Sequence, residues 1–181
     1  MNMFRLSIIL ALLNLGCGRE PASDPRSIYG TDDRVEVYES TSTTLKKAAA
    51  SVVAIIKADK ISGNRVTGQT FAEKLNLCAG ERFRDQLTAA SCSGFLAGPD
   101  VVVTAGHCMK TADDCSNARL VFDYAYTAPG SDPYSISQDR VYNCKQVVKF
   151  VHGGQDKNDF AVIKLDRAVS DRTPLKVRTS G

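Results

Sequence analysis

The chain has 181 residues, of which 43% are hydrophobic and 24% are charged. This length and composition are those of an ordinary soluble protein and allow one globular domain with a sizeable core. The 23 basic and 20 acidic residues give a net charge of +3 and form no long basic run. Charge therefore indicates neither nucleic acid nor an anionic surface as a partner.

Residues 1–18 have the pattern of a secretory signal peptide. A charged start at Arg5 precedes a largely apolar stretch, residues 6–15, which is too short to span a bilayer as a permanent helix. Cleavage after Gly18 would release a soluble, secreted protein. Alternatively, Cys17 resembles the lipidated first residue of bacterial lipoproteins, and a lipid on Cys17 would then be the membrane anchor. The sequence predicts an exported protein, either a periplasmic or outer-surface lipoprotein or a secreted one.

The next segment, residues 19–27, is polar and contains two prolines, which suits a tether or a short propeptide. The predicted domain covers residues 28–181. Within it, short apolar or alternating runs recur between turn residues, a pattern typical of an all-β barrel or sandwich. The expected strands are residues 51–57, 93–98, 100–106, 118–124, 145–151 and 159–165. Residues 43–51 have helix-forming composition and predict one short helical turn.

Residues 91–108 are predicted to form a β-hairpin with its turn at residues 98–100. Such a hairpin places Cys92 and Cys108 near each other at its open end. Two small residues precede His107, so the backbone can pack closely there and leave the imidazole projecting from a rigid strand end. That is a suitable mount for a general base, which must be held within hydrogen-bond reach of a nucleophile.

Five cysteines follow Cys17, in keeping with export, because disulfides persist outside the cytosol. Their spacing contains no CxxC pair, so we expect neither a structural zinc site nor any other metal or cofactor. The odd number leaves one cysteine unpaired, or paired to something outside this set. The pairing of Cys78, Cys115 and Cys144 stays open, with Cys115 to Cys144 preferred.

The segment TAGHC, residues 104–108, resembles the histidine motif of the trypsin and chymotrypsin-like serine peptidases. The resemblance includes the cysteine after the histidine and a second cysteine 16 residues before it. It implies that His107 is the catalytic base and that Cys92 pairs with Cys108, a bridge worth about 3 kcal/mol. It also implies polypeptide substrates and an all-β fold: the first six-stranded antiparallel barrel of a two-barrel peptidase, with the second barrel largely missing.

In this family an aspartate follows the histidine in the chain, fixes its tautomer and stabilises the imidazolium. Asp159 opens the run DFAVIKL, which resembles the family's aspartate motif, and lies 52 residues after His107. The resemblance implies that Asp159 is the orienting carboxylate. We expect it to be buried beside apolar residues and compensated by the imidazole N–H. Asp156 and Asp166 are expected in polar turns and His152 in a surface loop.

The start of the predicted domain, RSIYGTDDRVEV, resembles the opening of mature bacterial glutamyl endopeptidases. The resemblance implies propeptide cleavage between Arg26 and Ser27, and it favours substrates with acidic cleavage sites. An acidic and basic turn that enters the first strand is equally compatible with these residues. A mature protein that begins at Ser27 is therefore a hypothesis for N-terminal sequencing.

The family's nucleophile is a serine within Gly-Asp-Ser-Gly-Gly or a close variant. Ser170 and Ser180 are the serines after Asp159, and neither has a glycine two residues before it. We expect the chain to carry the base and the orienting carboxylate of a serine endopeptidase without its nucleophile, and to be inactive alone. It is then either a partial sequence of an endopeptidase precursor or a non-catalytic exported binding or decoy module. The coding sequence beyond Gly181 distinguishes the two.

Overall fold

The structure is a computed structural model, and it describes residues 32–154 and 157–178. The predicted signal peptide and tether, with Cys17, Arg26 and Ser27, lie outside the described residues, as do Asp156 and Ser180. Over the described part of the chain, no helix has the length and apolar character needed to cross a membrane.

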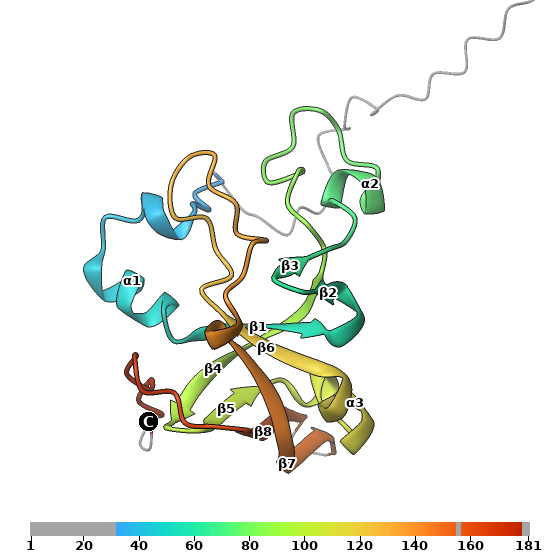
Figure 1. Cartoon of the computed structure of the whole chain (residues 1–181), viewed down its shortest axis with the longest axis vertical. Coiled ribbons are helices and arrows are strands. Elements are labelled where there is room, and N and C mark those ends of the chain that lie inside the picture. Colours follow the sequence, from blue (N-terminus) through green and yellow to red (C-terminus); the bar gives the residue numbers. More distant parts are fainter. Residues whose placement is uncertain (1–31, 155–156, 179–181) are drawn as a thin grey trace, which may run out of the picture.

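Six antiparallel strands form a closed barrel, which occupies the lower half of Figure 1. Their order around the barrel is β1-β4-β5-β8-β7-β6. The strands are β1 Val52–Lys57, β4 Ala90–Gly98, β5 Val101–Thr104, β6 Ala118–Phe122, β7 Val141–Gly153 and β8 Asn158–Leu165. The expected all-β fold with a six-stranded antiparallel barrel is confirmed.

All six predicted strands are present, and β4 and β5 form the predicted hairpin. The largest difference is β7, which has 13 residues instead of the predicted seven. Its first part pairs with β6 and its remainder pairs with β8, with register shifts along the β8 side. Such irregularities interrupt the alternation of apolar and polar residues, so the pattern marks only the middle of the strand.

The barrel interior is filled by alternate side chains of its strands, as the two-residue period of a strand requires. On β8, for example, Ala161, Ile163 and Leu165 are buried. The other buried strand residues of this core are Val53, Ile55, Leu96, Val102, Ala118, Leu120, Phe122 and Tyr142. Each large aliphatic side chain buried in this way contributes about 2 kcal/mol.

Residues 58–89 and 123–140 form a second region, here called the lobe, above the barrel in Figure 1. It contains η2 Ala58–Lys60, β2 Ile61–Ser62, β3 Arg65–Val66, α2 Phe71–Leu75 and η4 Gln138–Arg140. Its two segments are joined where the amide of Val66 donates to the carbonyl of Tyr134 at 2.8 Å. A smaller apolar cluster, with Ile56, Val66 and Val121 among its members, fills the space between the lobe and the barrel.

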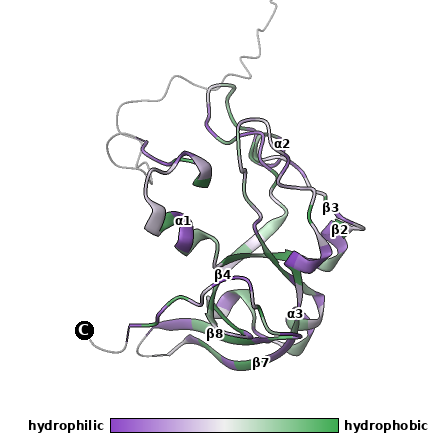
Figure 2. Cartoon of the chain, turned by 60° about the vertical axis from the view of Figure 1, so that its left-hand side comes forward, coloured by the Kyte–Doolittle hydropathy of each residue, from purple (hydrophilic) through white to green (hydrophobic). Residues whose placement is uncertain are grey.

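The lobe explains why parts of the barrel sequence are apolar without alternation. On β1, Ile55 faces the barrel interior while Ile56 packs under the lobe, and both are at most 3% exposed. A strand covered on both faces is hydrophobic along its whole length. Figure 2 shows the corresponding colours, with hydrophobic strands in the barrel and hydrophilic stretches on α1 and around β2.

The remaining elements are short: η1 Val37–Glu39, α1 Thr43–Ala49, η3 Gly106–Cys108 and α3 Ala112–Asn117. The predicted helical turn is α1, capped by the Ser42 hydroxyl, which accepts from the Leu45 amide. Helices α2 and α3 were not expected from the sequence. Both begin with a capping box, in which Thr70 and Thr111 cap the first turn. The pattern of threonine followed three residues later by an acidic residue is the signal that could have indicated them.

After β8 the chain continues across the barrel, and hydrogen bonds and an arginine side chain attach it there. The amides of Val169 and Leu175 donate to carbonyls of the β4–β5 hairpin region at 2.7 and 2.8 Å. The Arg172 side chain is only 7% exposed and forms two hydrogen bonds of 3.0 Å with the Asp123 carboxylate. Its guanidinium carbon lies 4.4 Å from the centre of the Phe122 ring. This segment therefore covers the side of the barrel near Phe122 and the β4–β5 hairpin.

Candidate active site

His107 lies in η3, the single 3-10 turn that follows β5. The residue before it must be glycine, because a Cβ on Gly106 would come within 2.1 Å of the Val151 carbonyl oxygen and 2.9 Å of Asp159 Oδ1. A real Cβ never approaches a backbone oxygen so closely. The backbone of η3 is thus pressed against β7, and the imidazole extends outward with 55% of the side chain exposed.

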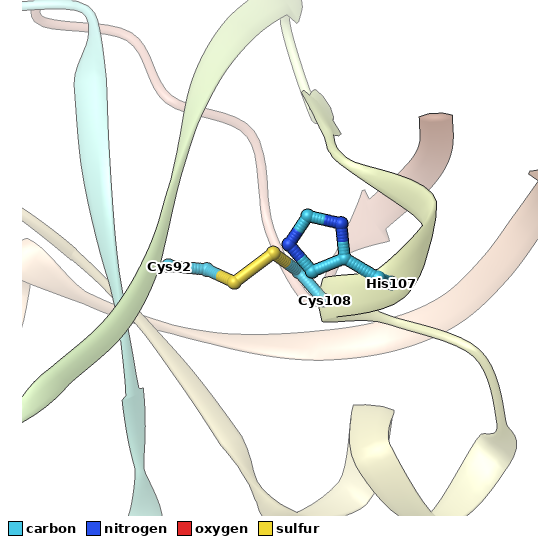
Figure 3. Close-up of side chains that lie close together, drawn as sticks. All are labelled: Cys92, His107 and Cys108. Carbon is cyan, nitrogen blue, oxygen red and sulfur yellow. A yellow bond between two sulfur atoms is a disulfide. The ribbon is translucent and has the colours of Figure 1, made fainter. Parts of the chain in front are cut away.

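A disulfide joins Cys108, at the end of η3, to Cys92 on β4 (Figure 3), with 6.2 Å between their Cα atoms. The imidazole of His107 lies beside this bridge, with ring and sulfur donor atoms within 4.8 Å of one another. A second disulfide joins Cys115 of α3 to Cys144 of β7, the pairing preferred from the sequence. The two bridges thus fix the chain that follows His107 at positions 108 and 115.

Asp159, the second residue of β8, lies directly against His107. Its Oδ2 is 2.6 Å from the imidazole Nδ1 of His107, and its Oδ1 accepts the backbone N–H of the same residue at 2.9 Å. The two residues are 52 positions apart in the sequence. They meet because β5 and β8 are paired, so η3 begins where β8 also begins.

The expectation that Asp159 is buried is wrong, because 34% of its side chain is exposed. The residue stands at the open end of β8, and the buried positions of this strand begin at Ala161. Hydrogen bonds from His107 and then from His152 hold the pKa of the Asp159 carboxyl well below its usual range. These contacts therefore stabilise the fold above about pH 4, the ordinary pKa of a free aspartate, and are lost only as the pH falls below that value.

His152 belongs to the same cluster, although its sequence context predicted no role for it in the site. It lies on β7 rather than in a surface loop, directly opposite Asp159 in the β7–β8 pairing. Its Nδ1 is 2.9 Å from Asp159 Oδ1, and its ring lies edge-on to His107 with the centroids 6.2 Å apart. The consecutive glycines Gly153 and Gly154 were the available sequence signal, because they indicate a turn that ends the strand after His152; in the structure both have positive φ.

Other residues considered from the sequence lie elsewhere. Asp166 follows β8 and accepts from the Asn143 amide at 3.2 Å and from its side chain at 2.7 Å, as suits a turn. Ser170 is exposed. Within residues 32–154 and 157–178, the hydrogen bonds of His107 go to Asp159 and to no serine hydroxyl.

The acidic and basic residues near the start of the described chain form their own cluster. Arg34 pairs with Asp32 at 2.8 Å and lowers the pKa of its carboxyl to about 2. Arg82 donates to the carbonyl oxygen of Asp32 at 3.0 Å. The guanidinium carbons of both arginines lie over the Phe83 ring, at 5.3 and 4.8 Å from its centre. These contacts attach the segment to the lobe and do not involve His107.

The cluster of His107, His152 and Asp159 also has the donor types of a metal site, with donor atoms within 4.8 Å of one another. Two imidazoles and a carboxylate are a common ligand set for zinc. Here both Nδ1 atoms are already hydrogen-bonded to the carboxylate. An ion bound through these two Nδ1 atoms would have to displace two imidazole protons.

The arrangement has a clear chemical capability. An ionised carboxylate only accepts hydrogen bonds, so the ring of His107 must carry its proton on Nδ1. The other ring nitrogen, Nε2, then has a free lone pair on an exposed side chain. A neutral imidazole held in this tautomer can take a proton from a hydroxyl, and the adjacent carboxylate stabilises the imidazolium that forms.

The closed antiparallel barrel with a histidine and aspartate at one end defines a chymotrypsin-like barrel. The family model described as Trypsin matches residues 80–179, more than half of the chain. The chain therefore belongs to the trypsin family. A search of curated proteins finds none that matches it.

Two solved structures illustrate the similarity. One is the secreted serine protease VesC from Vibrio cholerae, with 17% identity and a TM-score of 0.43 over 72% of this chain and 22% of that protein. The other is the VesB protease from Vibrio cholerae, with 12% identity and a TM-score of 0.43 over 80% of this chain and 34% of that protein. The chain thus spans about a third of these proteins or less.

Proposed function

We propose that the protein is a serine-type endopeptidase in which His107 is the general base and Asp159 the carboxylate that orients it. The observation that carries this proposal is the contact of 2.6 Å between His107 Nδ1 and Asp159 Oδ2 in a chain of the trypsin family. The substrate class is polypeptide. In the reaction, Nε2 of His107 takes the proton of a serine hydroxyl as that oxygen attacks the peptide carbonyl, and then returns it to the leaving amine.

The described residues supply the base and its support but no nucleophile hydrogen-bonded to it. In the proposed reaction, the serine hydroxyl and the donors that stabilise the oxyanion are groups other than those that contact His107 in the described residues. The rigid support of His107 suits this division. Glycine at position 106 and the Cys92–Cys108 bridge fix the backbone of η3, so the imidazole can meet a hydroxyl presented from outside the barrel.

We also propose that the protein is exported. Two disulfides lie within a barrel of modest size, and disulfides form and persist in the periplasm or outside the cell rather than in the cytosol. A signal peptide over residues 1–18 accounts for that route. Mass spectrometry of the N-terminal peptide of the mature protein tests whether Cys17 is its first residue and carries a lipid.

The test uses the natural protein, meaning the product of its complete coding sequence, and compares it with two variants in a peptidase assay. His107→Ala removes the base, and Asp159→Asn keeps the shape of the side chain but favours the wrong imidazole tautomer. We expect kcat to fall by about 10⁴-fold in each. Asp166→Asn is the matched control, because it changes a carboxylate at the other end of β8 that does not contact His107. Its activity should stay within a factor of about two of the wild type.

Reaction with a serine-directed phosphonate separates the alternatives. The natural protein should form a covalent adduct on a serine, and the 181-residue chain should form none and hydrolyse no peptide. An adduct on the 181-residue chain would show that a serine within it is the nucleophile. Absence of both adduct and hydrolysis in the natural protein would replace the endopeptidase by a non-catalytic binding module.

A further inference from the structure

His152 is the one member of the site cluster to which the proposed mechanism gives no role. It is placed by the strand pairing, since His152 and Asp159 are direct partners between β7 and β8. Its ring also packs against Phe150 on the same face of β7, with the planes 28° apart and the centroids separated by 6.5 Å. With 47% of the side chain exposed, packing alone does not require a histidine here. The hydrogen bond to the Asp159 carboxylate does require a side chain with an N–H donor.

The protonation of His152 follows from its partner. Asp159 is held in its ionised form, because the hydrogen bonds of both imidazoles keep the pKa of its carboxyl low. An ionised carboxylate has no proton to donate, so the Nδ1 atom 2.9 Å from Oδ1 must be the donor. His152 and His107 are therefore both in the Nδ1–H tautomer when neutral, each with Nε2 unprotonated.

The donors are divided between the two oxygens of the carboxylate. Oδ1 accepts from the His107 amide at 2.9 Å and from His152 Nδ1 at 2.9 Å. Among the described residues, Oδ2 accepts only from His107 Nδ1, at 2.6 Å. Two donors from different elements, η3 and β7, fix the position of Oδ1. The position of Oδ2 is then determined by the geometry of the carboxylate. Without His152, one donor remains on Oδ1 and the carboxylate can turn about its terminal bond.

We propose that His152 is a positioning residue, whose Nδ1–H holds the Asp159 carboxylate so that Oδ2 accepts the Nδ1 proton of His107. The proposal rests on the proposed function, in which the His107 tautomer matters for proton transfer. His152 acts through Asp159 and does not contact the reacting atoms. Loss of its donor should therefore shift the tautomers of His107 without changing the fold.

Two variants separate the hydrogen bond of His152 from its packing. His152→Asn keeps a donor, because the amide nitrogen of asparagine can occupy the place of Nδ1. His152→Phe keeps an aromatic ring beside Phe150 but has no donor. Nitrogen chemical shifts of the His107 ring in the 181-residue chain report the ratio of its two neutral tautomers. Thermal unfolding and amide spectra show whether each variant is folded, and His152→Ala replaces the phenylalanine variant if the larger ring disturbs β7.

We expect His107 in the wild type to be mainly the Nδ1–H tautomer. His152→Phe should lower the ratio of the Nδ1–H to the Nε2–H tautomer by up to about tenfold, the value reached if the turned carboxylate no longer accepts the charge-assisted hydrogen bond of His107. His152→Asn should restore most of the wild-type ratio. In the natural protein, kcat should also fall in His152→Phe while KM stays unchanged. The fall in kcat should be smaller than the change in the ratio, because the fraction of the Nδ1–H tautomer changes less than the ratio does.

The outcomes distinguish this inference from the proposed function. If the ratio in folded His152→Phe or His152→Ala equals that of the wild type, His152 does not position the carboxylate, and the base and orienting roles of His107 and Asp159 are unaffected. If wild-type His107 is mainly the Nε2–H tautomer, the pair of His107 and Asp159 is not formed, and the proposed function fails together with the inference.

Discussion

In the barrel, every strand has hydrogen-bonded neighbours on both sides, whereas β2 and β3 of the lobe contain two residues each. Among the described residues, the barrel core contains 14 buried residues and the cluster beneath the lobe contains six, three of which belong to the barrel strands themselves. All three residues of the candidate site stand on η3, β7 and β8, and none stands on the lobe. The comparison indicates that the barrel, whose strands are paired on both sides, holds the three site residues in place, whereas the lobe contributes none of them.

The largest expected effect is the removal of a core side chain from the barrel. Leu96 on β4 is fully buried, whereas Leu75 at the end of α2 in the lobe is 58% exposed. Leu96→Ala should lower the free energy of unfolding by about 3 kcal/mol, because it removes buried methyl groups and leaves a cavity. Leu75→Ala should change it by less than about 0.5 kcal/mol. Urea denaturation of both variants measures the contrast, and equal losses would mean that the lobe is as tightly packed as the barrel.

Loss of the Cys92–Cys108 bridge should lower the free energy of unfolding by as much as Leu96→Ala, or slightly less. The cysteines are 16 residues apart, and a closed loop of this length stabilises by about 3 kcal/mol. The double variant Cys92→Ser and Cys108→Ser should show this loss in denaturant unfolding. Amide exchange should also become faster around η3 and remain unchanged in α2. Unchanged exchange at His107 would show that the bridge does not hold the site.

Glycine positions allow a sharper comparison between the regions. Gly106→Ala should lower the free energy of unfolding by about 2 kcal/mol and displace His107 from Asp159, because the new methyl group collides with the Val151 carbonyl. Gly80→Ala in the lobe meets nothing within 4 Å and should leave stability nearly unchanged. Unfolding curves give the energies, and ring nitrogen shifts of His107 report the displacement. A Gly106→Ala protein as stable as the wild type would contradict the close packing of η3.

The smallest expected effect concerns the lobe alone. Thr70 caps α2: its hydroxyl oxygen accepts from the Glu73 amide at 3.1 Å, and the Glu73 carboxylate accepts from the Thr70 amide at 2.8 Å. Thr70→Ala should lower the free energy of unfolding by about 1 kcal/mol, and less if α2 frays independently of the barrel. Protease cleavage within residues 67–89 should become faster while the His107 spectrum stays the same. A change at His107 would show that the lobe and the site are coupled.

Local patterns predict much of the fold. Alternating and continuous apolar runs indicate all six barrel strands, and the turn residues at positions 98–100 indicate the β4–β5 hairpin. These features depend on neighbouring residues, so a single sequence contains them. The lobe was not predicted, because its pieces, residues 58–89 and 123–140, are joined by contacts between distant backbone groups and have only short elements of their own.

The candidate site divides in the same way. The sequence by itself indicated His107 and Asp159 as candidate site residues through their motifs. It also indicated the bridge between Cys92 and Cys108, because the spacing of these cysteines resembles that in the family. Only the tertiary structure decided that Asp159 is partly exposed and that His152 shares its carboxylate. The physical reason is register. A shift of one residue between β7 and β8 would turn His152 to the opposite face, and the pairing that prevents it depends on the whole barrel.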